Sequence, residues 1–74
     1  MTEQQRLALI VAERIGDVMY ACRMTKRGLA IRAGVDERTI RKLLNGDDVK
    51  LSTLEKVATA LHTEVAALLQ RPAA

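Results

Sequence analysis

The chain has 74 residues, 49% of them hydrophobic, with no Trp, no Phe and a single Tyr. This length allows one domain at most, with a modest core that must be aliphatic. The only cysteine, Cys22, excludes an internal disulfide, and neither Cys22 nor His62 has neighbours at the spacing of a zinc site. We therefore expect no metal and no cofactor.

The net charge of +3 is concentrated in the middle of the chain. Residues 23–50 hold eight Lys or Arg against four Asp or Glu, whereas the rest of the chain holds four against five. This asymmetry favours a polyanionic partner, although a charged face is more often simply a solvated one. The longest uninterrupted apolar run, residues 7–12, is far shorter than the roughly 18 residues of a membrane span, and no signal peptide is recognisable. We expect a soluble, cytoplasmic protein with no membrane partner.

Residues 2–23 have the pattern of one long helix with an apolar stripe. Gly16 inside it is a poor helix former and marks a kink or a close contact. The stripe predicts that Cys22 is a core residue. Its members, at spacings of three and four, are Leu7, Ile10, Val11, Ile15, Val18, Met19 and Cys22.

A second helix is predicted over residues 26–33. Thr25 has the side chain of an N-cap, and Gly34 is free to end the helix with a positive φ. Gly28 within the helix is a local weakness, which marks either a close helix crossing or fraying.

A third helix is predicted over residues 37–44. Asp36 is its expected N-cap, and Asn45-Gly46 is a stop signal because both residue types tolerate the left-handed conformation. Gly34-Val35 joins the second and third helices by a tight turn with an apolar plug. Two helices joined in this way, with a basic outer face, are what reading a DNA major groove requires.

Two further helices complete the pattern. Ser52 and Glu55 have the spacing of a capping box, which predicts a helix that starts there and runs to His62 as its C-terminal cap. Thr63 is the expected cap of a fifth short helix, and residues 71–74 form a frayed tail. The predicted fold is one compact all-α domain of five helices over residues 1–74. The apolar positions of the last two helices are Leu54, Val57, Ala58, Leu61, Val65, Leu68 and Leu69.

The apolar, turn and capping residues stand in one register: Ile15, Val18, Thr25, Leu29-Ala30, Gly34-Val35, Thr39-Ile40, Asn45-Gly46, Leu54, Val57, Ala58, Leu61, Val65 and Leu68-Leu69. In this register the chain resembles the helix-turn-helix domain of lambda-repressor and Cro-like regulators, the XRE type. The resemblance covers residues 15–69 and leaves residues 1–14 as an extension of the first helix. It implies a lambda-repressor-like fold with the helix-turn-helix at the second and third helices.

The resemblance also implies which residues meet DNA. In relatives, the position of Lys26 is commonly Gln, which contacts the DNA backbone and braces the first residue of the recognition helix. Lysine can hold a phosphate but lacks the amide for that brace. The positions that read bases are matched or flanked by Glu37, Arg38, Arg41 and Lys42. The positions that contact phosphates are matched by Thr25, Lys26, Arg32, Asn45, Lys50 and Ser52.

The side-chain chemistry refines these roles. Arg38 and Arg41 can each donate two hydrogen bonds to guanine, which is worth about 1–3 kcal/mol of discrimination per good pair. Glu37 would repel phosphates and suits the groove as an acceptor for cytosine N4. An equally good account makes Glu37 an anion at a helix N-terminus, favoured by about 0.3–1 kcal/mol.

The function that follows is a sequence-specific regulator of transcription that binds double-stranded DNA. We expect a bacterial or phage-encoded repressor that binds an inverted repeat as a homodimer, with residues 37–44 in the major groove. No nucleophile, base and orienting residue are recognisably arranged, so we expect no enzyme. The alternative is a protein-interaction module, antitoxin-like or cofactor-like, that keeps the fold without reading DNA. A regulatory protein partner fits either hypothesis.

Two apolar segments are candidate dimer surfaces. Leu7, Ile10 and Val11 extend the first helix beyond the usual start of the family domain and need cover. Leu68 and Leu69 offer a C-terminal contact, although relatives often bury these positions inside the monomer. We favour a contribution from the first helix.

Overall fold

The computed structural model describes residues 2–70, and these form helices without a strand. The expected all-α fold is confirmed, and the second and third helices have the predicted bounds. The tail predicted to fray, residues 71–74, lies outside the described residues. No helix within residues 2–70 has both the length and the apolar character to cross a membrane. The helices are α1 (Glu3–Ala21), α2 (Lys26–Ala33), α3 (Glu37–Leu44), α4 (Leu51–Ala60) and α5 (Val65–Leu68).

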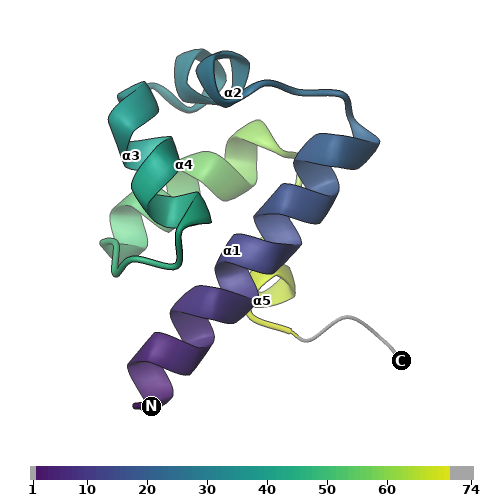
Figure 1. Cartoon of the computed structure of the whole chain (residues 1–74). Helices are drawn as coiled ribbons and strands as arrows, with labels where there is room; N and C mark the ends of the chain where they lie inside the picture. Colours follow the sequence, from purple (N-terminus) through teal and green to yellow (C-terminus); the bar gives the residue numbers. More distant parts are fainter. Residues whose placement is uncertain (1, 71–74) are drawn as a thin grey trace.

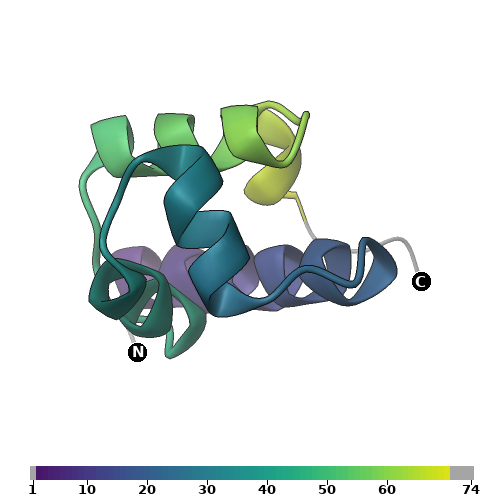
Figure 2. The ribbon, with the colours of Figure 1, turned by 90° about the horizontal axis from the view of Figure 1, so that it is seen from above.

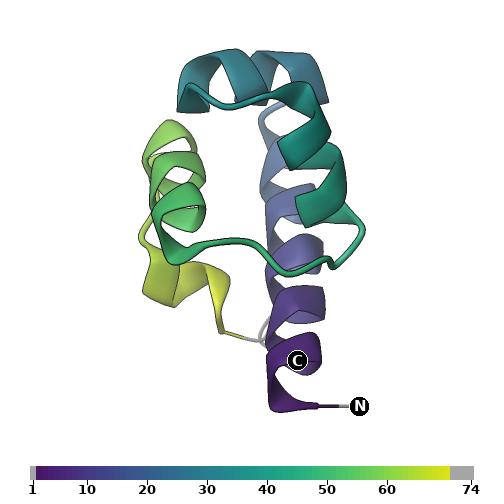
Figure 3. The same cartoon turned by 90° about the vertical axis from the view of Figure 1, so that its left-hand side faces the viewer.

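The helices enclose a single core. The long α1 runs along one side of the molecule, and α2 lies across one end of it (Figure 1). Seen from above, α1 and α4 lie on opposite sides, with α2 crossing between them (Figure 2). Helix α2 packs against α3 and α4, α3 packs against α1, and α5 packs against both α1 and α4. Figure 3 shows that this leaves α3 on the outside of the molecule, directly after α2.

The core is aliphatic, as the composition predicts. Cys22 does not belong to it: the cysteine is exposed, and its prediction as a core residue was wrong. Helix α1 ends at Ala21, so the spacing of the stripe no longer applies at Cys22. Met24 packs against the core instead. The largest side chains that are completely buried are Ile15, Leu29, Ile40, Leu43, Leu68 and Val57.

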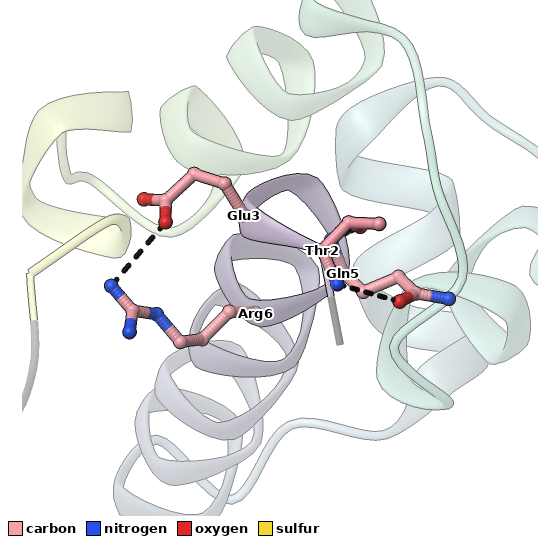
Figure 4. A network of polar contacts seen from close by, with 4 residues as sticks. All are labelled: Thr2, Glu3, Gln5 and Arg6. Carbon is pink, nitrogen blue, oxygen red and sulfur yellow. Dashed lines mark hydrogen bonds and ion pairs between the residues drawn. The ribbon is translucent and has the colours of Figure 1, made fainter.

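Helix α1 begins with a capping box. The Thr2 hydroxyl accepts a hydrogen bond from the Gln5 amide at 3.1 Å, and the Thr2 amide donates to the Gln5 side chain at 3.0 Å. Glu3 and Arg6 form an ion pair at 3.4 Å on the same turn (Figure 4). These contacts order the first turn of a helix that extends beyond the predicted DNA-binding elements.

The other N-terminal caps differ partly from the prediction. Thr25 caps α2 by accepting from the Gly28 amide at 2.9 Å, as predicted, whereas Asp36 takes the N-cap position of α3 without a side-chain hydrogen bond. The predicted capping box at Ser52 is wrong. The carbonyl of Lys50 accepts from the Leu54 amide at 3.1 Å, which makes Lys50 the N-cap and places Ser52 inside the first turn.

Thr63 is not the cap of α5, because Glu64 takes that position. The Thr63 amide donates to the carbonyl of Ala58 at 2.9 Å, so Thr63 still belongs to the end of α4. This end includes His62, whose φ of 57° fits the C-terminal cap that the sequence predicts. The helix that follows this end of α4 is α5, which is a single short turn.

Gly34 and Gly46 end α2 and α3 in the left-handed conformation, with φ of 72° and 83°. After each glycine, the next amide donates back into the helix: Val35 to Ala30 and Asp47 to Lys42, both at 3.0 Å. These are Schellman ends, and they fix the direction in which the chain leaves each helix. The stop predicted after α3 is confirmed, and Gly46 alone supplies its left-handed residue.

Three glycines meet different surroundings. A Cβ on Gly46 would lie 2.6 Å from Leu9 Cδ2, so α1 passes very close to the end of α3. A Cβ on Gly16 would meet nothing within 4 Å, and the close contact considered for it is not found. A Cβ on Gly28 would lie 3.1 Å from the Thr25 hydroxyl, which belongs to its own helix cap and not to a crossing helix.

We predict that Gly46→Ala destabilises the domain by about 1–3 kcal/mol, because it combines positive φ with a clash against Leu9. In a domain of this size, each kcal/mol lowers the Tm by about 4–8 °C. The matched control is Gly16→Ala, which has free space in a helix interior and should raise stability by about 0.5–1 kcal/mol. Thermal unfolding followed by circular dichroism measures both. A Gly46→Ala protein as stable as the unaltered chain would contradict the close packing of α1 on this turn.

Candidate nucleic-acid interface

A helix cap, a tight turn and the core hold α2 and α3 together. Thr25 closes the start of α2, and Gly34 turns the chain so that Val35 packs against the core. In α3, Ile40 is 0% and Leu43 is 1% exposed, and burial of these two side chains fixes the rotation of the helix about its axis. The opposite face of α3 therefore points to solvent.

That outward face is basic. Arg38, Arg41 and Lys42 are all exposed, and exposed Asn45 directly follows the helix. Glu37 differs, because it lies half-buried in the first turn of α3. The structure thus places the predicted base-reading residues on one helix, with three cations outward and the carboxylate at their flank.

Glu37 is paired with Arg41. Its carboxylate Oε2 lies 3.6 Å from Arg41 Nη1, one helical turn further along, and the side chains are 42% and 56% exposed. An exposed pair of this kind, with the acid on the N-terminal side, contributes only about 0.3–0.5 kcal/mol. Among the described residues, Lys26 forms no ion pair with Glu37. The pair with Glu37 therefore orients the Arg41 side chain, but it is too weak to prevent Arg41 from making another contact.

The predicted phosphate contacts lie at helix ends. Thr25 and Lys26 are at the start of α2, Asn45 follows α3, and Lys50 is the N-cap of α4. All four are exposed.

Arg32 and Ser52 lie together elsewhere. Arg32 is in the last turn of α2, and both residues line an open hollow between α2 and α4. Glu55, Lys56 and His62 line the same hollow, so Ser52 and Glu55 do share a surface although they form no capping box. The structure thus brings Arg32 and Ser52 together on a second surface, whereas the other four predicted phosphate contacts lie at the ends of α2, α3 and α4.

The loop between α3 and α4 carries two acids, Asp47 and Asp48. Gln4 Nε2 of α1 donates a hydrogen bond to Asp48 Oδ2 at 2.6 Å. No local sequence pattern predicts this contact, because the two residues are 44 positions apart in the chain. Within residues 2–70, no group of three or more His, Cys, Asp or Glu side chains is placed to hold a metal ion.

The predicted dimer residues are divided between core and surface. Val11 is 4% and Leu68 is 1% exposed, so the monomer's own core covers both. Leu7 and Ile10 are half-buried, whereas Leu69 is exposed. Sequence reasoning missed exposed Leu51, which begins α4 one residue before the helix start predicted at Ser52.

An apolar hollow of about 210 Å³ opens beside these side chains. Leu7 and Ala8 of α1 form one wall, and Leu51, Leu54 and Leu69 form the other. The first wall could be predicted from the sequence, because its residues belong to an apolar run on α1. The second wall comes from α4 and the end of α5, which only the fold brings together.

Comparison with known proteins supports the DNA-binding fold. No curated protein is significantly similar to the chain. Among solved structures, the crystal structure of apo-HppE superposes with a TM-score of 0.73 at 26% identity, over 84% of this chain and 35% of that one. The chain thus spans about a third of that protein's length. The sequence model of the Cro/C1-type HTH DNA-binding domain matches residues 14–74. The resemblance seen in the sequence is confirmed, and the chain belongs to the Cro/C1-type helix-turn-helix DNA-binding domain family.

Proposed function

We propose that this protein is a sequence-specific regulator of transcription that places α3 in the major groove of DNA. The observation that carries this proposal is the face of α3. Arg38, Arg41 and Lys42 point outward from a helix whose rotation is fixed by two buried side chains, Ile40 and Leu43. A helix held in this way keeps its side chains in a constant register against the base edges.

Arg38 and Arg41 are the proposed guanine readers, since each guanidinium can donate two parallel hydrogen bonds to O6 and N7. Glu37 holds Arg41 from its flank and is the proposed acceptor for cytosine N4 of a neighbouring pair. A free carboxylate would repel the phosphates, whereas one already paired with Arg41 brings less uncompensated charge to the groove. Lys42 adds a flexible donor at the edge of the same face.

Lys26, Asn45 and Lys50 are the proposed phosphate contacts beside α3, together with the Thr25 hydroxyl, which can still donate while it accepts from Gly28. Thr25 and Lys26 lie at the start of α2, and Asn45 and Lys50 lie in the segment after α3. Phosphate contacts on either side of a recognition helix fix its position on the duplex. Arg32 and Ser52 are the proposed contacts of the second surface.

The regulator acts as a homodimer on an inverted repeat, with two α3 helices about 34–36 Å apart. The proposed dimer surface is the rim of the apolar hollow, where Leu51 is 61% and Leu69 is 37% exposed beside Leu7. Ile10, half-buried on α1 three residues after Leu7, is a further residue proposed for this surface. A repressor of this kind acts in the cytoplasm by occluding RNA polymerase from the bound site.

Selection of bound duplexes from a random library, followed by a salt titration, tests the proposal. We expect a two-fold symmetric site bound at least about 10³-fold more tightly than random DNA. Binding that is absent at low salt, or equal for selected and random duplexes, would refute the regulator. That result would favour the protein-interaction module, for which the apolar hollow offers a surface.

Arg41→Ala should weaken the selected site by about 5- to 150-fold, and it should remove the preference at one base pair per half-site. The control is Arg6→Ala, which removes the same charge from the exposed first turn of α1. Competition with singly substituted duplexes measures the preference. A uniform loss over all duplexes would instead make Arg41 a phosphate contact.

Lys26→Ala should reduce the steepness of the plot of log affinity against log salt by about one unit per protomer, because one phosphate is no longer neutralised. Base preferences should stay unchanged. The measurement is the affinity for the selected duplex at four or more salt concentrations. An unaltered slope would remove Lys26 from the set of phosphate contacts.

Leu51→Glu combined with Leu69→Glu should convert the dimer to a monomer, because the substitutions place two charges on the exposed apolar wall that α4 and the end of α5 form. Sedimentation equilibrium measures the mass. The matched control is Ile31→Glu, which charges an exposed apolar residue on α2, away from the hollow. A dimer that survives the double substitution, or that the control disrupts equally, would place the interface elsewhere.

A further inference from the structure

The first part of α1 lies outside the matched family domain, which begins at residue 14. This part is nevertheless well built, with a capping box at Thr2 and an unbroken helix from Glu3 onward. It also reaches the loop between α3 and α4, residues 45–50. That loop carries Asn45 and Lys50, two of the proposed phosphate contacts.

Two contacts join α1 to this loop. Gln4 Nε2 donates to Asp48 Oδ2 at 2.6 Å, which is the distance of a strong hydrogen bond to a carboxylate. One turn later, Leu9 lies over Gly46 so closely that a Cβ there would come within 2.6 Å of its side chain and 3.8 Å of its Cα. Thr2, Gln5 and Ala8 line the same small hollow as Gln4, Gly46 and Asp48.

We propose that Gln4 and Leu9 are positioning residues that clamp the loop after α3 and set the affinity for DNA. This inference rests on the proposed function. Leu9 fixes the end of α3 by packing on Gly46, and Gln4 holds the Asp48 carboxylate against α1. Neither residue needs to touch DNA for this effect.

The charge of Asp48 explains why its position matters. A carboxylate about 4 Å from a phosphate raises the energy by about 1 kcal/mol in water, which is a factor of about five in affinity. Held by Gln4, the carboxylate stays on the α1 side of the loop. Released from Gln4, it is free to turn toward the phosphates that Asn45 and Lys50 are proposed to contact.

Gln4→Ala tests the clamp, because Gln4 is exposed and its replacement leaves the core intact. We expect affinity for selected and random duplexes to fall alike, by about two- to fivefold at low salt, with less effect at high salt. The Tm and the base preference should not change. Gln70→Ala, an exposed glutamine at the other end of the described chain, is the control.

Asp48→Ala completes a double-mutant cycle. It removes the negative charge and should raise affinity by about two- to threefold, and so should Asp47→Ala, the adjacent acid without a bond to Gln4. If Gln4 acts through Asp48, then Gln4→Ala has no effect in the Asp48→Ala background but keeps its full effect in the Asp47→Ala background. An unchanged affinity for Gln4→Ala alone, or the same loss in both backgrounds, would overturn the inference.

Amide hydrogen exchange gives a readout without DNA. Gln4→Ala and Leu9→Ala should each speed exchange at the amides of residues 46–49, while the α2 amides keep their rates. If the unaltered chain binds no duplex, then the proposed function fails, and the exchange rates still decide whether α1 holds the loop. Unchanged exchange at residues 46–49 in both variants would show that it does not.

Discussion

The burial of Ile40 and Leu43 is the constraint on which the candidate interface depends. Full burial of such side chains is worth about 1.5–3 kcal/mol each, several times the about 0.3–0.5 kcal/mol of the exposed Glu37–Arg41 pair. Packing, and not charge, therefore decides how α3 is rotated. The basic residues face outward because the aliphatic ones must face inward. Gly34 makes this possible by turning the chain within one residue, so that Val35 reaches the core and α3 starts directly afterwards.

Glu37 takes part in two interactions within α3. It lies in the first turn of α3, where the helix dipole favours an anion, and it also pairs with Arg41. Neither interaction prevents a role at the groove. The bidentate contact proposed between Arg41 and guanine would be worth about 1–3 kcal/mol, which is more than the exposed pair contributes, so the pair would not prevent it. In the free protein, the pair keeps the Arg41 side chain over the recognition face.

Local signals predicted the helix-turn-helix well. The bounds of α2 and α3 follow from residues that act on their own neighbours: Thr25 at one end, and Gly34 and Gly46 at the others. Prediction failed at the exact residues where α4 begins and α1 ends. The Ser52 pattern is correct for a capping box, but the carbonyl of Lys50 accepts the first helical bonds, so α4 starts one residue before Ser52. Cys22 continues the spacing of the stripe, but α1 has already ended there.

In the candidate site, local effects could be predicted from the sequence and distant ones could not. The cations of α3 could be assigned to an outward face from spacing alone, because the buried positions of the same helix define the opposite face. The dimer residues could not be assigned from spacing. The period of an apolar stripe does not show whether the stripe is buried inside the monomer or against a second copy of the chain. Val11 and Leu68 are covered by the chain itself, and Leu51 is not. The bond from Gln4 to Asp48 has no sequence signal at all, because it depends on how α1 crosses the end of α3. Two of the four acids in the central segment are therefore engaged within the protein: Glu37 pairs with Arg41, and Asp48 accepts the bond from Gln4. The exposed cations Arg38, Arg41 and Lys42 dominate the outward face of α3.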